Sequence, residues 1–200
     1  MDPSNNDKLK IGIYSGSFNP PGIHHRKIVE NVLKYVDYLI LSPCGSKHRK
    51  DKIFPKDIFR KEMIKIAFSN LDKLIIDYTS LDDDIFMSNH ELKNKYNLLF
   101  SKNTNKNIIF YHIVGSDLTC FYKNKKSVIE LFWEKGEDLW NNDNFIIIPR
   151  KNFRLDYLPK NYLLLPNEIP GSSTQIKMNI QNSDDLLPEV KNYILKNKLY

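Results

Sequence analysis

Short apolar runs alternate with segments of helical periodicity along most of this chain, and this alternation limits the fold more than any other feature of the sequence. Six runs have the length and composition of buried strands: KIGIYSG, DYLILSP, KLIIDY, NIIFYHIVGSD, NFIIIPR and NYLLLP. Between them, apolar residues recur at helical spacing, as at Ile28, Val29, Val32 and Val36. Strands that alternate with helices predict an α/β fold built on a parallel sheet.

The chain of 200 residues has the length of a single domain. We expect a Rossmann-like, doubly wound parallel sheet with helices on both faces and a small C-terminal helical part over about residues 171–200. Helices are expected over six segments: residues 23–36, 55–70, 87–102, about 118–131, 172–181 and 187–200. The polar stretches KNTNKN and WNNDN are expected to be loops.

The charge balance gives a first indication of the partners. The sequence has 30 Lys and Arg against 24 Asp and Glu residues, a net charge of +6. This charge favours anionic partners, and a solvated lysine-rich surface would also account for it. No RNP-type, KH-type or zinc motif is visible. The apolar segments are too short to span a bilayer, and the first residues lack the core of a secretory signal. We therefore expect neither nucleic acid nor a membrane as a partner.

The two cysteines indicate the redox environment. Cys44 and Cys120 are far apart and have no CxxC neighbour, so they form neither a disulfide framework nor a zinc site. Reduced thiols are the simplest interpretation. The expected location is cytoplasmic, with a nuclear location left open.

The first strand ends in a turn suited to an anion. After Tyr14, the sequence continues with Ser15, Gly16 and Ser17, then two prolines and a helix start. Small residues let backbone N–H groups approach phosphate oxygens, and a helix N-terminus adds further donors. The turn lacks the spacing of GxGxxG, and the chain has no GxxxxGK[ST] loop. The sequence therefore predicts a phosphate site that is neither a GxGxxG dinucleotide site nor a P-loop.

Two adjacent histidines follow this turn, and helical phase separates them. His25 precedes Ile28 and Val29 by three and four residues, so it falls on the inward stripe. His24 is rotated from it by about 100° on an ideal helix. We expect His25 to face the bound anion, and His24 to cap the helix or face solvent.

Several motifs together resemble the nicotinate/nicotinamide mononucleotide adenylyltransferase family of HxGH-type nucleotidyltransferases. These motifs are GSFNP followed by His25, VGSD, FWEKGEDL, FIIIPR, GSSTQIK and LPEVKNYILKNKLY. GSSTQIK resembles the family's ISSTxxR signature. The resemblance spans most of the chain and is weak between about Leu81 and Asn107. Gly22 stands where the first histidine of HxGH would fall, and Lys177 replaces the arginine of ISSTxxR, keeping the charge without the bidentate fork.

The resemblance implies an activity and its substrates. Such an enzyme transfers AMP from ATP to nicotinate mononucleotide, and the products are deamido-NAD and pyrophosphate. The mononucleotide phosphate attacks the ATP α-phosphate directly, with Mg2+ bound mainly through the ATP phosphates. Use of nicotinamide mononucleotide stays open, and the oligomeric state, including a homo-oligomer, cannot be read from the sequence.

The resemblance also implies roles for individual residues at the phosphate end of the site. It assigns catalytic roles to His25 and Lys177. ATP and phosphate binding fall to both ends of the chain: Ser15, Gly16, Ser17, Phe18, Ser172, Ser173, Thr174 and Arg150. Taken alone, the Ser-Ser-Thr run would mark only a helix start and Arg150 only a surface ion pair.

At the other end of the site, the resemblance implies mononucleotide binding by Lys47 and Trp133. Trp133 would stack on the pyridine ring, whereas Trp140 is expected in the core. Lys47 lies in a basic loop where His48, Arg49 and Lys50 are rival candidates: the loop could also be a solvated charge run. Gly115 and Asp117 are implied on the ribose or adenosine side. Asp117 is also the one candidate ligand for Mg2+, with capping of the next helix as its competing role.

Three other functions remain open at this stage. A phosphopantetheine adenylyltransferase or a cytidylyltransferase would share the first and last motifs, although the Trp133 segment and the C-terminal segment argue against both. Net charge alone supports a nucleic-acid-binding module. Gly22 and Lys177 would also suit a nucleotide-binding protein without catalytic activity.

Overall fold

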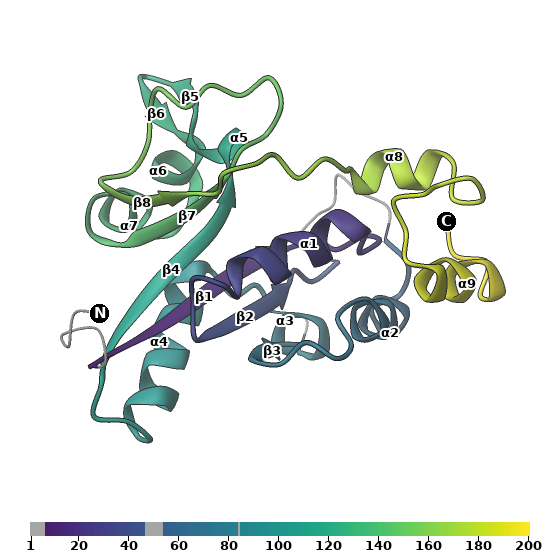
Figure 1. Ribbon diagram of the computed structural model, residues 1–200, viewed down its shortest axis with the longest axis horizontal. Helices are drawn as coiled ribbons and strands as arrows, with labels where there is room; N and C mark the ends of the chain where they lie inside the picture. Colours follow the sequence, from purple (N-terminus) through teal and green to yellow (C-terminus); the bar gives the residue numbers. More distant parts are fainter. Residues whose placement is uncertain (1–6, 47–53, 84) are drawn as a thin grey trace.

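Six parallel strands form the central sheet of the computed structural model, which describes residues 7–46, 54–83 and 85–200 (Figure 1). Their order across the sheet is β3-β2-β1-β4-β7-β8, and every neighbouring pair is parallel. The strands are β1 (Lys8–Gly16), β2 (Tyr38–Pro43), β3 (Leu74–Ile76), β4 (Asn107–Gly115), β7 (Asn144–Ile148) and β8 (Asn161–Leu164). Each coincides with one predicted apolar run, with β1 beginning two residues earlier than its run, so the doubly wound parallel sheet is confirmed. The strand order reverses between β1 and β4, where such sheets bind ligands at their carboxyl ends.

Helices pack on both faces of this sheet, as predicted. One face is covered by α1 (Ile23–Val32), α2 (Asp57–Ala67) and α9 (Pro188–Lys196), and the other by α4 (Asn89–Ser101), α6 (Val128–Phe132) and α7 (Gly136–Asn142). Both faces are covered because successive side chains of a strand point to opposite faces, as β2 shows. Leu39 and Leu41 pack with α1, α2 and α9, whereas Ile40 packs with α4. Apolar side chains on both faces of each strand explain the continuous apolar runs.

The C-terminal part consists of two helices that lie at one end of the sheet (Figure 1). They are α8 (Ser173–Met178) and α9, both inside the predicted segments. Ile176 of α8 and Val190 and Ile194 of α9 are buried in the same core as α1 and α2. This packing brings the end of the chain back to the first helix.

The single helix predicted over about residues 118–131 is wrong. A short α5 (Ser116–Thr119) is followed by a hairpin, β5 (Phe121–Lys123) and β6 (Lys126–Ser127), and then by α6. Asn124 and Lys125 have φ angles of 53° and 57°, the left-handed pair that a two-residue hairpin turn requires. A capping box then restarts the helix, because Ser127 Oγ accepts from Glu130 N at 3.2 Å and Glu130 Oε2 accepts from Ser127 N at 2.8 Å.

The loop predicted for WNNDN is also wrong in part, because α7 runs through its first three residues. Leu139 and Trp140 of this helix are 1% and 5% exposed. Their burial against β4 and β7 stabilises a helix that the polar residues alone did not indicate. The predicted core position of Trp140 is confirmed. The short α3 (Thr79–Asp82) completes the helices of the described residues.

Candidate active site at the carboxyl edge of the sheet

The predicted phosphate turn after β1 is held by aromatic packing. Phe18 has a φ of 43° and is 1% exposed, with its ring centroid 5.4 Å from that of Tyr14 and 5.1 Å from that of His25. A Cβ atom at Gly16 would lie 3.2 Å from the Phe18 ring. The turn therefore places the Phe18 side chain in the core and leaves its backbone and that of Ser17 at the edge of the sheet.

Arg60 joins this turn to the loop after β2, a role that the sequence did not reveal. Its side chain is fully buried, and Nη1 donates to the Ser17 carbonyl at 2.9 Å while Nη2 donates to the Cys44 carbonyl at 2.5 Å. Asp57 accepts from Nε at 3.1 Å and pairs with Nη2 at 2.9 Å. One guanidinium thus fixes two loops that border the site. Its position on the helix period of α2 marks it as inward, but its partners lie 43 and 16 residues away.

His25 lies at the first turn of α1, with a defined proton arrangement. Its Nδ1 accepts from the Gly22 backbone N–H at 3.0 Å, so the neutral ring carries its hydrogen on Nε2. Burial, and then the neighbouring His24 and Arg150, hold the pKa of His25 well below its ordinary value. The ring is therefore neutral at pH 7 and has an N–H group free to donate to a phosphate oxygen.

The prediction for His24 is wrong. His24 is only 4% exposed, and its ring centroid is 3.9 Å from that of His25, which itself makes the capping contact. The segment around Gly171 covers the start of α1, which helical phase alone could not show. A Cβ atom at Gly22 would lie 2.7 Å from the His24 ring, and one at Gly171 only 2.5 Å away. Glycine at position 22 thus leaves room for the imidazole of His24.

The GSSTQIK segment contacts the phosphate turn that follows β1, as the resemblance implied. Ser173 Oγ donates to the Pro20 carbonyl at 2.8 Å, across 153 residues of sequence. Ser172 is the N-cap residue of α8, and Thr174 is exposed on its first turn. Lys177 Nζ lies 6.0 Å from the centre of the Tyr200 ring.

The Tyr200 hydroxyl donates a hydrogen bond to Asn19 Oδ1 in the phosphate turn after β1. These contacts bring the GSSTQIK segment and the phosphate turn together at the junction between α1 and α8.

The end of β4 contributes an ion pair to the same edge. Asp117 Oδ1 lies 2.7 Å from Arg150 Nε, and the Arg150 backbone N–H donates to Ser116 Oγ at 2.9 Å. A Cβ atom at Gly115 would collide with both side chains. Arg150 also borders a cavity of about 380 Å³ beside Gly171 and Ser172. This geometry places Gly115, Asp117 and Arg150 next to the predicted phosphate site.

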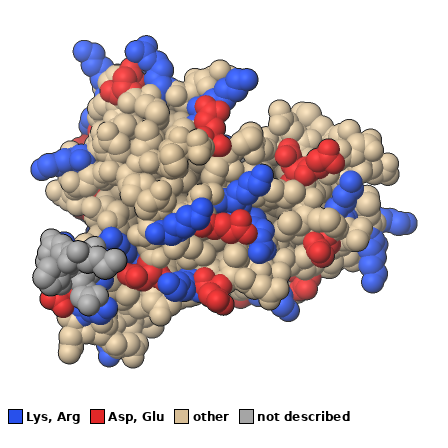
Figure 2. Space-filling model, viewed as in Figure 1, with Lys and Arg blue, Asp and Glu red and all other residues tan. Residues whose placement is uncertain are grey.

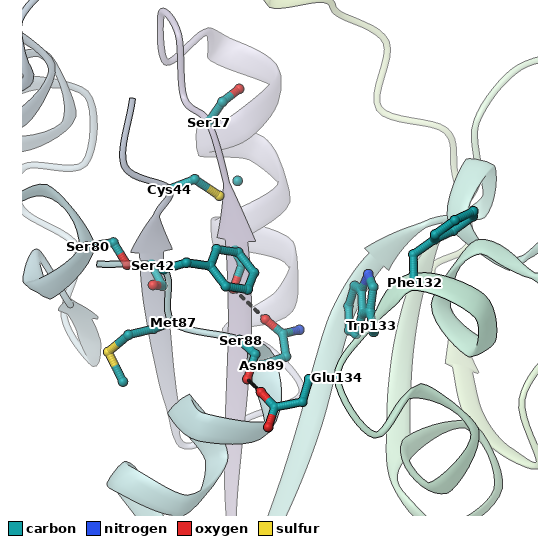
Figure 3. A pocket seen from close by; sticks show the side chains of 13 residues that line it. Ser17, Ser42, Cys44, Ser80, Met87, Ser88, Asn89, Phe132, Trp133 and Glu134 are labelled. Carbon is teal, nitrogen blue, oxygen red and sulfur yellow. Dashed lines mark hydrogen bonds between the residues drawn. The ribbon is translucent and has the colours of Figure 1, made fainter. Parts of the chain in front are cut away.

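A second cavity, of about 230 Å³, lies between the phosphate turn and Trp133 (Figure 3). Ser15, Gly16 and Ser17 form one part of its wall, and Trp133 lies on the opposite side. Lys47 and its rivals His48, Arg49 and Lys50 fall outside the described residues, so their roles stay predictions.

The sequence did not identify the remaining polar wall of this cavity. Ser88, Asn89 and Glu134 line it, and Ser88 Oγ donates to Glu134 Oε2 at 2.5 Å (Figure 3). The Ser-x-x-Glu pattern from Ser88 to Glu91 marks the start of α4, and this capping box is present. That pattern predicts a helix end near the sheet edge, but it does not predict a cavity.

The described residues contain no group of three or more His, Cys, Asp or Glu side chains that could hold a metal ion. Asp117, the candidate ligand, offers a single carboxylate that pairs with Arg150. Within the described ranges, no helix is long and apolar enough to cross a membrane. On the face shown in Figure 2, basic side chains are interspersed with acidic ones, and a notch separates the part carrying β5 and β6 from α8.

Comparison with known proteins adds independent findings. A family model described as cytidylyltransferase-like matches residues 13–179. A Fusobacterium nucleatum protein named "Probable nicotinate-nucleotide adenylyltransferase" is 31% identical over 188 residues, which cover 89% of this chain and 91% of the relative. A protein of the same name from Aliarcobacter butzleri is 28% identical over 190 residues, covering 94% and 96%.

A solved structure agrees with these relatives. The Plasmodium falciparum nicotinic acid mononucleotide adenylyltransferase complexed with NaAD superposes with a TM-score of 0.70 at 26% identity, covering 96% of this chain and 97% of that one. The fold, the junction of the two motifs and the sequence matches agree. The chain therefore belongs to the cytidylyltransferase-like family and, within it, to the nicotinate-nucleotide adenylyltransferases.

Proposed function

We propose that this protein transfers the adenylyl group of ATP to nicotinate mononucleotide, releasing pyrophosphate and deamido-NAD. The observation that carries the proposal is the contact between Ser173 and Pro20, which joins both predicted phosphate motifs beside the cavity that Trp133 lines. The names of the relatives support nicotinate mononucleotide as the acceptor, and the contact between the two motifs supports a triphosphate site at their junction.

The reaction needs positioning and charge stabilisation rather than a covalent enzyme intermediate. A phosphate oxygen of the mononucleotide forms a bond to the α-phosphorus, and the bond from that phosphorus to the bridging oxygen of pyrophosphate breaks. In this proposal, the Nε2–H group of His25 donates to a phosphate oxygen on which charge increases. Lys177 and Arg150 supply positive charge, and Ser172, Ser173 and Thr174 supply hydroxyl and backbone donors.

The mononucleotide occupies the cavity at the other side of the turn. Trp133 stacks on the pyridine ring, and Lys47 contacts the mononucleotide phosphate. Gly115 and Asp117 border the ribose or adenosine. Mg2+ would take most of its ligands from phosphate oxygens and water and neutralise the triphosphate, with Asp117 as a single protein carboxylate.

The test supplies Mg-ATP with one acceptor at a time and measures pyrophosphate release and the adenylylated product. Nicotinate mononucleotide, nicotinamide mononucleotide and phosphopantetheine are the acceptors, and a reaction without acceptor is the control. We expect the highest kcat/KM with nicotinate mononucleotide. Faster turnover with phosphopantetheine, or no release of pyrophosphate with either pyridine mononucleotide, would refute the proposal.

A further inference from the structure

A buried chain of polar side chains runs from the cavity wall into the core. Ser15 Oγ donates to Asn89 Oδ1 at 2.6 Å, and Asn89 Nδ2 lies 3.4 Å from His112 Nδ1. His112 Nε2 lies 2.8 Å from Asp143 Oδ2. Lys93 Nζ contacts both oxygens of Asp143, at 2.6 Å and 2.8 Å. Asn89, His112 and Asp143 are 8%, 0% and 8% exposed.

The hydrogen atoms in this row of hydrogen bonds can be assigned by starting from Asp143. Burial alone would raise the pKa of Asp143, but hydrogen bonds from His112 and Lys93 outweigh it and lower that pKa, so Asp143 is an ionised acceptor. His112 Nε2 therefore donates to Asp143. His112 Nδ1 lies opposite Asn89 Nδ2, which can only donate, so Nδ1 accepts from the NH2 group and the Asn89 oxygen faces Ser15.

Ser15 alone could not fix this orientation. A serine hydroxyl can donate to an amide oxygen or accept from an amide nitrogen, so it tolerates either position of the Asn89 amide. His112 donates to Asp143 at Nε2 and accepts at Nδ1, so it tolerates only the orientation in which the Asn89 NH2 group faces it. His112 and Asp143 thus fix the orientation of the Asn89 amide from its buried side. The His112 ring packs edge-on against Trp133, with 6.2 Å between the ring centroids.

The consequence lies in the cavity. Asn89 lines it together with Trp133, and the Asn89 nitrogen points toward the Trp133 side (Figure 3). One hydrogen of Nδ2 faces His112, and the structure describes no other partner for the second. We propose that Asn89 binds the pyridine mononucleotide by donating this hydrogen to one of its oxygen atoms, and that His112, held by Asp143, is the positioning residue for Asn89. This inference rests on the proposed function.

Steady-state kinetics of two His112 variants test the proposal. His112→Phe keeps an aromatic ring in the core but cannot accept from Asn89, so the amide is free to turn. We expect the KM for nicotinate mononucleotide to rise about fivefold to tenfold, with kcat and the KM for ATP changing less than twofold. In His112→Gln, the side-chain oxygen can accept from Asn89 while the NH2 group donates to Asp143. This variant should restore the KM to within about twofold of wild type.

Two further variants keep the test decisive. Asn89→Ala removes the donor directly and should raise the same KM about tenfold, even if His112→Phe folds poorly. His90→Phe changes the neighbouring histidine, which bonds to Asn94 on α4, and is the matched control for a local packing effect.

Equal KM values for His112→Phe and wild type would overturn the inference, as would equal shifts for Phe and Gln. An unchanged KM in Asn89→Ala would also overturn it. Wild-type protein that does not turn over nicotinate mononucleotide would refute the proposed function and this inference together. An active wild type with an unmoved KM in the variants refutes this inference alone.

Discussion

The two sides of the site are built in different ways. On the phosphate side, backbone groups and small residues of the first turn meet GSSTQIK, and Gly22 and Gly171 leave room for the His24 ring. On the pyridine side, larger side chains such as Met87, Phe132 and Trp133 line the cavity together with small ones, and a row of buried polar side chains holds Asn89 in place.

This difference shows where each side is sensitive. The phosphate side depends on close approach of backbone, so an added methyl group disturbs it. The pyridine side depends on which group donates and which accepts, so a change of hydrogen-bonding pattern at constant volume disturbs it. We expect the first kind of damage to lower kcat or stability, and the second to raise the KM of the mononucleotide.

Loss of the His25 imidazole should have the largest effect on the phosphate side. His25→Ala removes the Nε2–H donor and should lower kcat/KM at least about 100-fold, the scale for loss of a transition-state donor. Pyrophosphate release at saturating ATP and mononucleotide measures it. Turnover within about threefold of wild type would exclude His25 from the mechanism.

An added methyl group at Gly171 should be nearly as damaging, through stability. Gly171 has a φ of 141°, a conformation that other residues rarely adopt, and its Cβ would lie 2.5 Å from the His24 ring. Gly171→Ala should lower the free energy of unfolding by about 3 kcal/mol, measured by urea denaturation. Adding His24→Ala should recover part of this loss by removing the clash. A Gly171→Ala protein of wild-type stability would show that the backbone approach is not required.

The same contrast explains what the sequence could predict. The six strands were predictable because each forms a continuous apolar run that ends at Gly, Pro or Asp, including β8, which is largely exposed at the sheet edge. The contact between the two predicted phosphate motifs could be anticipated because each motif is a run of consecutive residues. His24 was misplaced because helical phase contains no information on Gly171, which lies far along the chain and covers it.

On the pyridine side, Trp133 was expected, but Asn89 and its buried partners were not predictable, for a related reason. Asn89 and His112 are 23 residues apart, and His112 and Asp143 are 31 apart, with no motif joining them. Hydrogen-bond partners of this kind are set by strand order, because β4 and β7 are neighbours in the sheet and α4 packs against β4. The Asn124–Lys125 turn was missed because neither residue is glycine, the usual signal for a left-handed turn.

The close packing on the phosphate side should also give a pH-dependent stability. Burial, followed by the charge of Arg150, lowers the pKa of His24 from 6.5 to about 4. The unfolded chain therefore binds more protons between these values, and the free energy of unfolding must decrease as the pH falls. We expect a loss of about 2 kcal/mol between pH 7 and pH 5 from this residue.

Urea denaturation of wild type and His24→Phe at both pH values measures the effect. The wild-type minus variant difference isolates His24, because His25 has a lowered pKa as well and adds a decrease of the same sign. Parallel pH profiles for the two proteins would contradict the prediction.

The smallest predicted effect concerns the pyridine side and separates its two tryptophans. Trp133→Leu removes an aromatic face from the cavity and should raise the KM for nicotinate mononucleotide about fivefold, with the KM for ATP unchanged, because stacking contributes about 1 kcal/mol. Trp140, 5% exposed in the adjoining core, is the matched control. Trp140→Leu should lower the melting temperature and leave both KM values near wild type. An equal KM shift in the two variants would mean that Trp133 acts through core packing, as Trp140 does, and not through contact with the ring.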